Sequence, residues 1–287
     1  MKIKFIYILP ALFIALWSCL PEPLETEVEQ AESKLVISSQ VIPGNFILIT
    51  VSRSFSALEG SYGVDLDEDD LDQFLVKNAR VVLNYANRTD TLFTTPDAPG
   101  VYLSLLRLED ENESFELHVY DSLTKESVTA SSTMLNRVSL NSAEIKREPI
   151  EAFDDTLHKL NLIFTDPPED NWYVLNVFDP GAIGQSDFSF GNNEGSVYTQ
   201  LITDKAYEGS EIEIKAEIIG FELKDTAVVM FSNISEEYFR FLDARARGGN
   251  IISSVTGEPI NHPTNVQGGY GYFNTHNPSI RQVVIKD

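Results

Sequence analysis

The side chains best suited to catalysis are 44 acidic residues and four histidines, His118, His158, His262 and His276. The histidines are scattered, and neither His262 nor His276 has a carboxylate or second ligand at metal-binding spacing. The chain has no Gly-x-Ser-x-Gly elbow, no His-Glu-x-x-His and no phosphate loop. A carboxylate pair for glycoside hydrolysis stays open, because such a pair forms only in three dimensions. We therefore predict a protein that is not an enzyme and uses no cofactor.

The acidic stretch 65–72 invites a calcium interpretation. Asp65, Asp67 and Asp69 match the first three liganding positions of a helix–loop–helix calcium loop. The match then fails, since the sixth position is Asp70 rather than glycine and the twelfth is Val76 rather than glutamate. An acidic turn leading into a short helical piece is the favoured alternative, with the acids near the helix N-terminus. Asp65, Asp67 and Asp69 remain the candidate metal ligands.

Cys19, the only cysteine in 287 residues, has the position that indicates the most definite chemistry. It follows two lysines, Lys2 and Lys4, and an apolar run over residues 5–16, in the ending Leu-Trp-Ser-Cys. This pattern is similar to the lipobox of a bacterial lipoprotein signal peptide, and the run is too short to span a bilayer. We predict a signal peptide over residues 1–18 and a mature chain anchored by acyl chains, such as palmitate, on Cys19. A chance cysteine behind an N-terminal anchor helix is the alternative.

Residues 19–33 form an acidic flexible tether. Its glutamates just behind Cys19 resemble the surface-export signal of Bacteroidota lipoproteins, with an ordinary charged linker as the alternative: Glu22, Glu25, Glu27 and Glu29. The net charge of −23 becomes −25 once the two signal-peptide lysines are removed. Such a charge disfavours nucleic acid and anionic membrane surfaces as partners. We expect a lipid-anchored protein of the outer membrane that faces the cell exterior.

From residue 34 onward, short segments alternate apolar and polar residues. The segments 34–41 and 46–55 flank a Pro-Gly-Asn turn, and the segments 79–87 and 90–96 flank Arg88 and Thr89. About seven such strands predict an N-terminal β-sandwich over residues 34–134. Its predicted core includes Leu83, Tyr85, Tyr102, Leu117 and Val119.

Residues 135–287 predict a second sandwich. The segment 172–178 is apolar on both faces, which is typical of a sheet centre. One helix is expected at about 235–247, with Ser235 as its N-cap and an apolar stripe that packs on a sheet. The glycine-rich stretch 180–197 predicts a long loop, where binding is commonly found. The predicted fold is mainly β, with two Ig-like or fibronectin-like β-sandwich domains in tandem.

The most distinctive internal pattern lies near the C-terminus and consists of Asn265, Gly268, Gly269, Gly271 and Phe273. Together with LVISSQVIPG and TDPPEDNWYVLNV, it resembles a family of surface lipoproteins known as domain of unknown function 4249. The resemblance implies an exported Bacteroidota lipoprotein with Ig-like β domains, often encoded beside TonB-dependent transporters. It brings no catalytic residue.

These observations favour a non-catalytic binding or accessory subunit of a TonB-dependent transporter or nutrient-uptake system. Loop 180–197 and the turn 265–273 are its candidate contact regions. A structural subunit or spacer of a surface assembly is the alternative. A glycan-binding module would need Trp172, Tyr270 or Tyr272 exposed as a stacking platform.

An Asp-Ser/Thr-apolar pattern occurs four times and resembles the O-glycosylation signal of exported Bacteroidota proteins. The candidate acceptors lie at predicted turns or strand starts: Thr91, Ser122, Thr156 and Thr226.

Overall fold

The computed structural model describes residues 32–54, 73–107, 113–150, 155–180, 196–207, 210–219, 223–248 and 262–287. The predicted signal peptide, Cys19, the tether glutamates, the candidate ligands Asp65, Asp67 and Asp69, and residues 181–195 of the predicted loop lie outside these ranges. Ser33–Asp287 forms one compact unit. In the part of the chain that the structure describes, no helix has the length and apolar character needed to cross a membrane.

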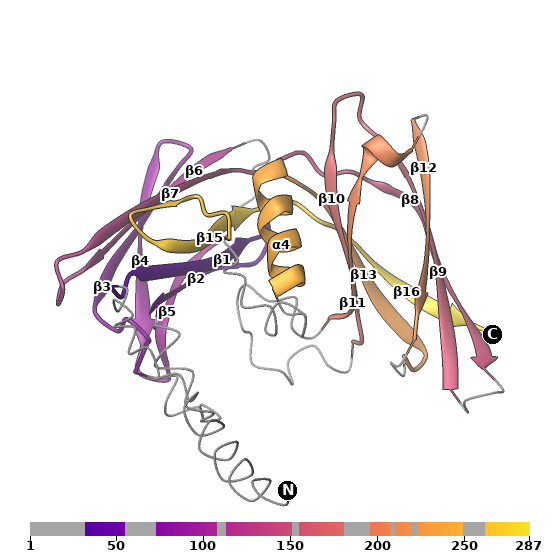
Figure 1. Cartoon of the computed structure of the whole chain (residues 1–287), viewed down its shortest axis with the longest axis horizontal. Helices are drawn as coiled ribbons and strands as arrows, with labels where there is room; N and C mark the ends of the chain where they lie inside the picture. Colours follow the sequence, from indigo (N-terminus) through magenta and orange to yellow (C-terminus); the bar gives the residue numbers. More distant parts are fainter. Residues whose placement is uncertain are drawn as a thin grey trace, which may run out of the picture. The chain divides into compact units, whose positions relative to one another are not determined.

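The chain is mainly β, as predicted, and its strands form two sheets (Figure 1). The first sheet has nine strands in the order β14-β7-β6-β3-β4-β5-β2-β1-β15. Their bounds are β1 Leu35–Val41, β2 Phe46–Arg53, β3 Ala79–Tyr85, β4 Arg88–Thr95, β5 Ala98–Arg107, β6 Ser114–Asp121, β7 Ser127–Thr133, β14 Val266–Gln267 and β15 Tyr270–Thr275.

The second sheet has seven strands in the order β11-β10-β13-β16-β8-β9-β12. Their bounds are β8 Leu140–Ile150, β9 Asp155–Thr165, β10 Trp172–Phe178, β11 Ser196–Thr203, β12 Glu211–Ile218, β13 Thr226–Ile234 and β16 Ser279–Lys286, and a 3-10 turn, η1 Asp204–Ala206, follows β11. The apolar strand β10 lies between β11 and β13 rather than at an edge, as its composition predicted.

The expected division at residues 134 and 135 needs a correction at its C-terminal side. Residues 266–275 do not belong to the second sheet, because β14 pairs with β7 and β15 pairs in parallel with β1 (Figure 1). The first sheet is therefore built from β1–β7 and from two later strands, β14 and β15, that precede the last strand of the second sheet. An alternating apolar pattern predicts that a segment is a strand, but it does not predict which distant strand that segment pairs with.

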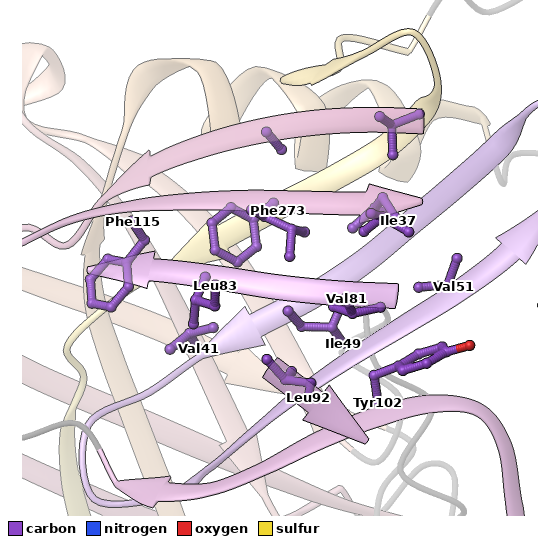
Figure 2. Packing of buried hydrophobic residues seen from close by; sticks show 14 of the residues in the cluster. Ile37, Val41, Ile49, Val51, Val81, Leu83, Leu92, Tyr102, Phe115 and Phe273 are labelled. Carbon is purple, nitrogen blue, oxygen red and sulfur yellow. The ribbon is translucent and has the colours of Figure 1, made fainter. Parts of the chain in front are cut away.

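The core of the first sheet is formed by inward-facing side chains from all nine of its strands, part of which Figure 2 shows. The predicted core residues are all buried, with exposed fractions of 0 to 6%. Phe273 of β15 belongs to the same cluster as Ile37 of β1, so the C-terminal segment adds to this core. A separate cluster fills the second sheet and includes Phe164, Tyr173 and Phe231, whose ring centroids lie 4.6–5.0 Å apart.

The hairpin between β3 and β4 turns two residues earlier than expected. Ala86 and Asn87 have positive φ values of 45° and 59°, and Arg88 already belongs to β4. Two successive left-handed residues are typical of a tight two-residue hairpin turn, and asparagine tolerates that conformation well. The local preference of Asn87 therefore decides the position of the turn.

The one α-helix in the described residues, α4 Glu236–Gly248, agrees with the prediction. The Ser235 hydroxyl accepts a hydrogen bond from the backbone N–H of Tyr238 at 3.2 Å, which is the expected N-cap. Tyr238 and Leu242 are buried against Val174 of β10, together with Ile234 and Tyr272. The helix thus joins a face of the second sheet to β15 of the first.

Candidate interaction surface

The glycines of the C-terminal motif allow two backbones to approach closely. A Cβ atom on Gly271 would lie 2.0 Å from the carbonyl oxygen of Ile37, and one on Gly269 would lie 2.5 Å from that of Leu35. Gly268 and Gly271 also have positive φ values of 84° and 88°. Only glycine meets both requirements without strain, so these residues place β15 beside β1.

Asn265 fastens the same segment to the opposite edge of the sheet. Its Nδ2 donates to the backbone oxygens of Ser131 and Phe273 at 2.8 and 2.7 Å, and its Oδ1 accepts from the N–H of Phe273 at 2.9 Å. Ser131 belongs to β7, so one side chain links β7 to β15. The motif therefore bridges the two edges of the first sheet, which are otherwise open to other strands.

The three aromatic side chains proposed as sugar platforms differ in exposure. Tyr272 is 6% exposed and packs in the α4 cluster. Trp172 is half-buried, and the Lys205 ammonium lies 5.2 Å from its ring centroid. Tyr270 is 45% exposed, but Lys34 lies 5.2 Å from its ring centroid. A lysine ammonium therefore lies over one face of each of these two rings, where a stacked sugar would compete with it.

A broad face without charge lies on the outside of the first sheet, across β4, β5, β2 and β1. In these strands the alternate residues Leu92, Tyr102, Ile49 and Ile37 point into the core. The residues between them point outward, and the following members carry no charge: Thr89, Thr91 and Phe93 on β4, Val101, Leu103 and Leu105 on β5, Leu48, Thr50 and Ser52 on β2, and Val36 and Ser38 on β1. The charged residue Arg107 stands at the end of β5, opposite Phe46, and bounds this face. We call the uncharged residues of this set the uncharged face.

The apolar members of the uncharged face are neighbours across the sheet. Leu103 is paired with Phe93 on one side and with Leu48 on the other. Phe93 is 46% exposed and Leu105 is 66% exposed, while Phe46 at the start of β2 is 47% exposed. Leu103 and Leu48, which lie between these residues, are half-buried. Exposed apolar side chains gathered on one face mark interaction sites in soluble domains.

Charged residues occur again on β3 and β6, the two strands beyond β4 in the sheet. Arg80 on β3 and Glu116 on β6 are exposed. Charged residues make up 23% of the chain, so an extended set of outward residues that carry no charge is unusual for this protein. This apolar outer face could have been predicted from the sequence, because β2 and β5 carry apolar residues at both alternating sets of positions. The prediction that each strand buries one face only does not anticipate this second apolar face.

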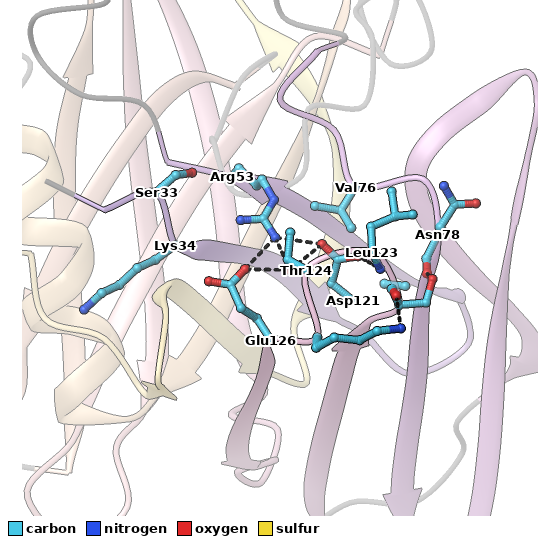
Figure 3. A network of polar contacts seen from close by, with 12 residues as sticks. Ser33, Lys34, Arg53, Val76, Asn78, Asp121, Leu123, Thr124 and Glu126 are labelled. Atoms are coloured by element: carbon cyan, nitrogen blue, oxygen red, sulfur yellow. Dashed lines mark hydrogen bonds and ion pairs between the residues drawn. The ribbon is translucent and has the colours of Figure 1, made fainter. Parts of the chain in front are cut away.

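A polar network holds one end of the first sheet together (Figure 3). Arg53 at the end of β2 donates to Asp121 at 2.7 Å, to Thr124 at 2.6 Å and to Glu126 at 2.5 Å. Burial alone would raise the pKa of Asp121, but hydrogen bonds from Arg53, the N–H of Leu123 and Thr124 lower it overall. These bonds fix the β6–β7 turn, so the network is structural and supports the adjoining strands.

Ser232 and His276 have the spacing of a nucleophile and its base, with Oγ and Nδ1 2.9 Å apart. Ser232 is 0% exposed and His276 is 2% exposed, so substrate has no access to the hydroxyl. The His276 Nε2 has no hydrogen-bond partner among the described residues, and burial lowers the pKa of this histidine to about 4. The pair is a neutral buried contact between the β15–β16 connection and β13.

Charged and polar residues make up most of the lining of two open hollows on the described surface. One of about 430 Å³ lies over β8, β9 and β12, with Lys146, Lys159 and Lys215 in its lining. Lys159 pairs with Glu148 at 2.5 Å and Lys215 with Glu213 at 3.0 Å, so most of this positive charge is compensated. The other, of about 830 Å³, surrounds the β3–β4 turn. Neither combines an apolar wall with convergent polar groups, as ligand pockets do.

The four candidate glycan acceptors differ in accessibility. Thr91 and Ser122 are exposed, whereas Thr156 and Thr226 are half-buried. The Ser122 hydroxyl donates to the carbonyl of Asn78 at 2.8 Å. Thr91 belongs to the uncharged face, beside Phe93.

These features describe a two-sheet, mainly β protein in which β14 and β15, near the C-terminus, complete the first sheet. The family model described as Domain of unknown function (DUF4249) matches residues 21–281, and the chain belongs to this family. A comparison with curated proteins finds no match. Among solved structures, the crystal structure of chicken CNTN1 FN1-FN3 domains is similar over 88% of this chain and 67% of that chain, with 8% sequence identity and a TM-score of 0.24. A superposition at this level does not establish a shared arrangement of strands.

Proposed function

We propose that this protein is a lipid-anchored, non-catalytic surface subunit that binds another outer-membrane protein through the uncharged face. In this proposal the chain is a Bacteroidota lipoprotein whose two sheets are Ig-like sandwiches, and the partner is a TonB-dependent transporter. The observation that carries it is that the outward residues named above carry no charge over four neighbouring strands of a strongly acidic chain, up to Arg107 at the end of β5. Burying that face against a partner removes apolar surface from water without leaving an unpaired charge behind.

The position of the face behind the N-terminus supports a membrane-protein partner. The uncharged face begins on β1, the first strand after the predicted tether. Fifteen extended residues span at most about 50 Å, so a chain anchored at Cys19 would hold this face within that distance of the membrane. A transporter that projects from the outer membrane lies within this reach.

Co-purification from native membranes in mild detergent tests the proposal. We expect a TonB-dependent transporter to co-purify with the full chain, and the double change Phe93→Glu and Leu105→Glu to abolish it. Both side chains are about half exposed or more, so the substitutions leave the core intact. The matched control is Tyr120→Glu on β6, which is 41% exposed but lies outside the uncharged face.

The outcomes separate the proposal from its alternative. Retention of the transporter by the double variant would show that the uncharged face is not the contact. A stoichiometric complex without a transporter would favour the structural subunit or spacer. A glycan at Thr91 would cover this face, so glycosylation there and docking there exclude each other.

A further inference from the structure

Three strand ends meet at one end of the second sheet. In the sheet register, Trp172 at the start of β10 is opposite Thr203 at the end of β11 and opposite Ile234 at the end of β13. The residues next to these positions are polar, namely Asn171, Asp204 and Asn233. Two of them, Asn171 and Asn233, are 4% and 6% exposed.

Asn171 connects the other two side chains. Its backbone N–H donates to Asp204 Oδ2 at 2.6 Å, and its side-chain Oδ1 accepts from Asn233 Nδ2 at 3.0 Å. The hydroxyl of Tyr173, two residues further on, donates to Asp166 Oδ1. The contacts gather Asp166, Asp204 and Asn233 around the first residues of β10.

Two acceptor oxygens in this group have no donor among the described residues. Asp204 Oδ1 and Asn233 Oδ1 are both buried and unpaired. Both oxygens belong to side chains that contact Asn171, since Asn233 Nδ2 donates to its side chain and Asp204 Oδ2 accepts from its backbone N–H. A buried acceptor without a partner costs about 1–3 kcal/mol, so two together indicate that something binds there.

The charge of this end is negative. The turn 166–171 carries Asp166, Glu169 and Asp170, and Asp204 lies against it. Lys205 contacts the turn, but it pairs with Asp170 at 3.0 Å. Among the described residues, neither Asp166 nor Asp204 forms a direct ion pair, although the charge of Lys205 also interacts with Asp204.

We propose that Asp204, Asn233 and Asp166 hold a divalent cation of the calcium type at this end of the second sheet. Calcium takes six to eight oxygen ligands from carboxylates, amide and backbone carbonyls, and water, in flexible geometry. Groups of three His, Cys, Asp or Glu side chains suited to a metal do not occur in the described ranges, so the amide oxygen of Asn233 is an essential part of this donor set. The cation neutralises the acidic turn and gives both buried oxygens a partner. The site is separate from the uncharged face.

Terbium luminescence and thermal unfolding of the full chain in detergent test the site. Terbium replaces calcium and emits when a nearby indole transfers energy to it. We expect sensitised emission from Trp172 that added Ca²⁺ displaces, and an unfolding temperature that rises with Ca²⁺ and falls with a chelator. Trp172→Phe should remove most of the emission but keep the Ca²⁺ effect on unfolding.

Three further variants identify the ligands. Asp204→Asn should weaken Ca²⁺ binding at least tenfold, while it keeps an oxygen for the Asn171 N–H. Asn233→Asp should tighten Ca²⁺ binding and make the unfolding temperature more dependent on Ca²⁺, a response that a purely structural asparagine would not give. Asp170→Asn is the matched control, because Asp170 is in the same turn but its carboxylate is exposed and paired with Lys205.

The result that would overturn the proposal is wild-type protein with neither displaceable terbium emission nor a Ca²⁺-dependent unfolding temperature. Equal loss of binding in Asp170→Asn and Asp204→Asn would also overturn it, since it would indicate a diffuse attraction to the acidic turn.

Discussion

At the residue scale, individual residues decide how the C-terminal segment joins the first sheet. Gly271 allows β15 to reach β1, and Asn265 allows it to reach β7. His276 is buried, neutral and bonded to Ser232. The contacts described for these residues are all with other parts of the fold. Their roles are in folding, and they are tested by stability.

Gly271→Ala should destabilise the fold by more than about 3 kcal/mol, because a methyl group would collide with the Ile37 carbonyl and the backbone has positive φ. Urea unfolding measures the change. Gly44→Ala is the control, since Gly44 also has positive φ but no atom within 4 Å of its added Cβ. The control should cost only about 1–2 kcal/mol. If both variants lost the same free energy of unfolding, the close approach of β15 to β1 would not be the reason that Gly271 is required.

His276 should make stability depend on pH in a defined window. Its pKa is about 4 in the fold against 6.5 in the unfolded chain, so the unfolded chain takes up the proton first as the pH falls. The free energy of unfolding should therefore decline by roughly 3 kcal/mol between pH 6.5 and pH 4. Asp121, whose pKa is lowered from 3.8, acts only below that window. Unfolding curves of wild type and His276→Asn isolate the histidine, and identical slopes would contradict its role.

At the element scale, β14 and β15 are the segments that the rest of the sheet depends on. They are short, they lie far along the chain from β1 and β7, and they join both edges of the first sheet. Helix α4 then packs on β15 through Tyr272. Loss of the β14–β15 connection should therefore loosen both the first sheet and the helix.

Asn265→Ala should open this connection, because it removes the bonds to Ser131 and to both backbone groups of Phe273. We expect a loss of about 2–3 kcal/mol and faster hydrogen exchange at the Phe273 amide. Thr89→Ala is a suitable control, since it removes only an exposed side-chain bond to Asn84. Unchanged exchange at Phe273 in Asn265→Ala would show that the asparagine is not what holds β15.

At the scale of the whole molecule, the proposed function needs both an anchor and a docking face. Cys19→Ser should move the protein from the membrane to the soluble fraction, because the thiol that carries the acyl chains is lost. Intact mass of the native protein measures the lipid, and it also reveals any glycan on Thr91 or Ser122. A wild-type mass equal to the bare polypeptide would contradict both modifications.

Much of the architecture could be predicted from local sequence. Alternation located most strands and the buried residues Leu83, Tyr102 and Leu117, and the capping serine located α4. The register of distant strands could not be predicted, since pairing between β1 and β15 depends on contacts between residues more than 200 positions apart. The same limit hid the grouping of Asp166, Asp204 and Asn233.

The sequence by itself determined the strand content, the helix, the membership of a family and the chemistry expected at Cys19, because each depends on neighbouring residues. Only the tertiary structure decided what the glycine motif does and where an uncharged surface remains. From the sequence alone, Gly271 could serve either a turn with positive φ or the close approach of two backbones. The Ile37 carbonyl beside it decides between the two, because a hard steric contact exists only once both strands are in place.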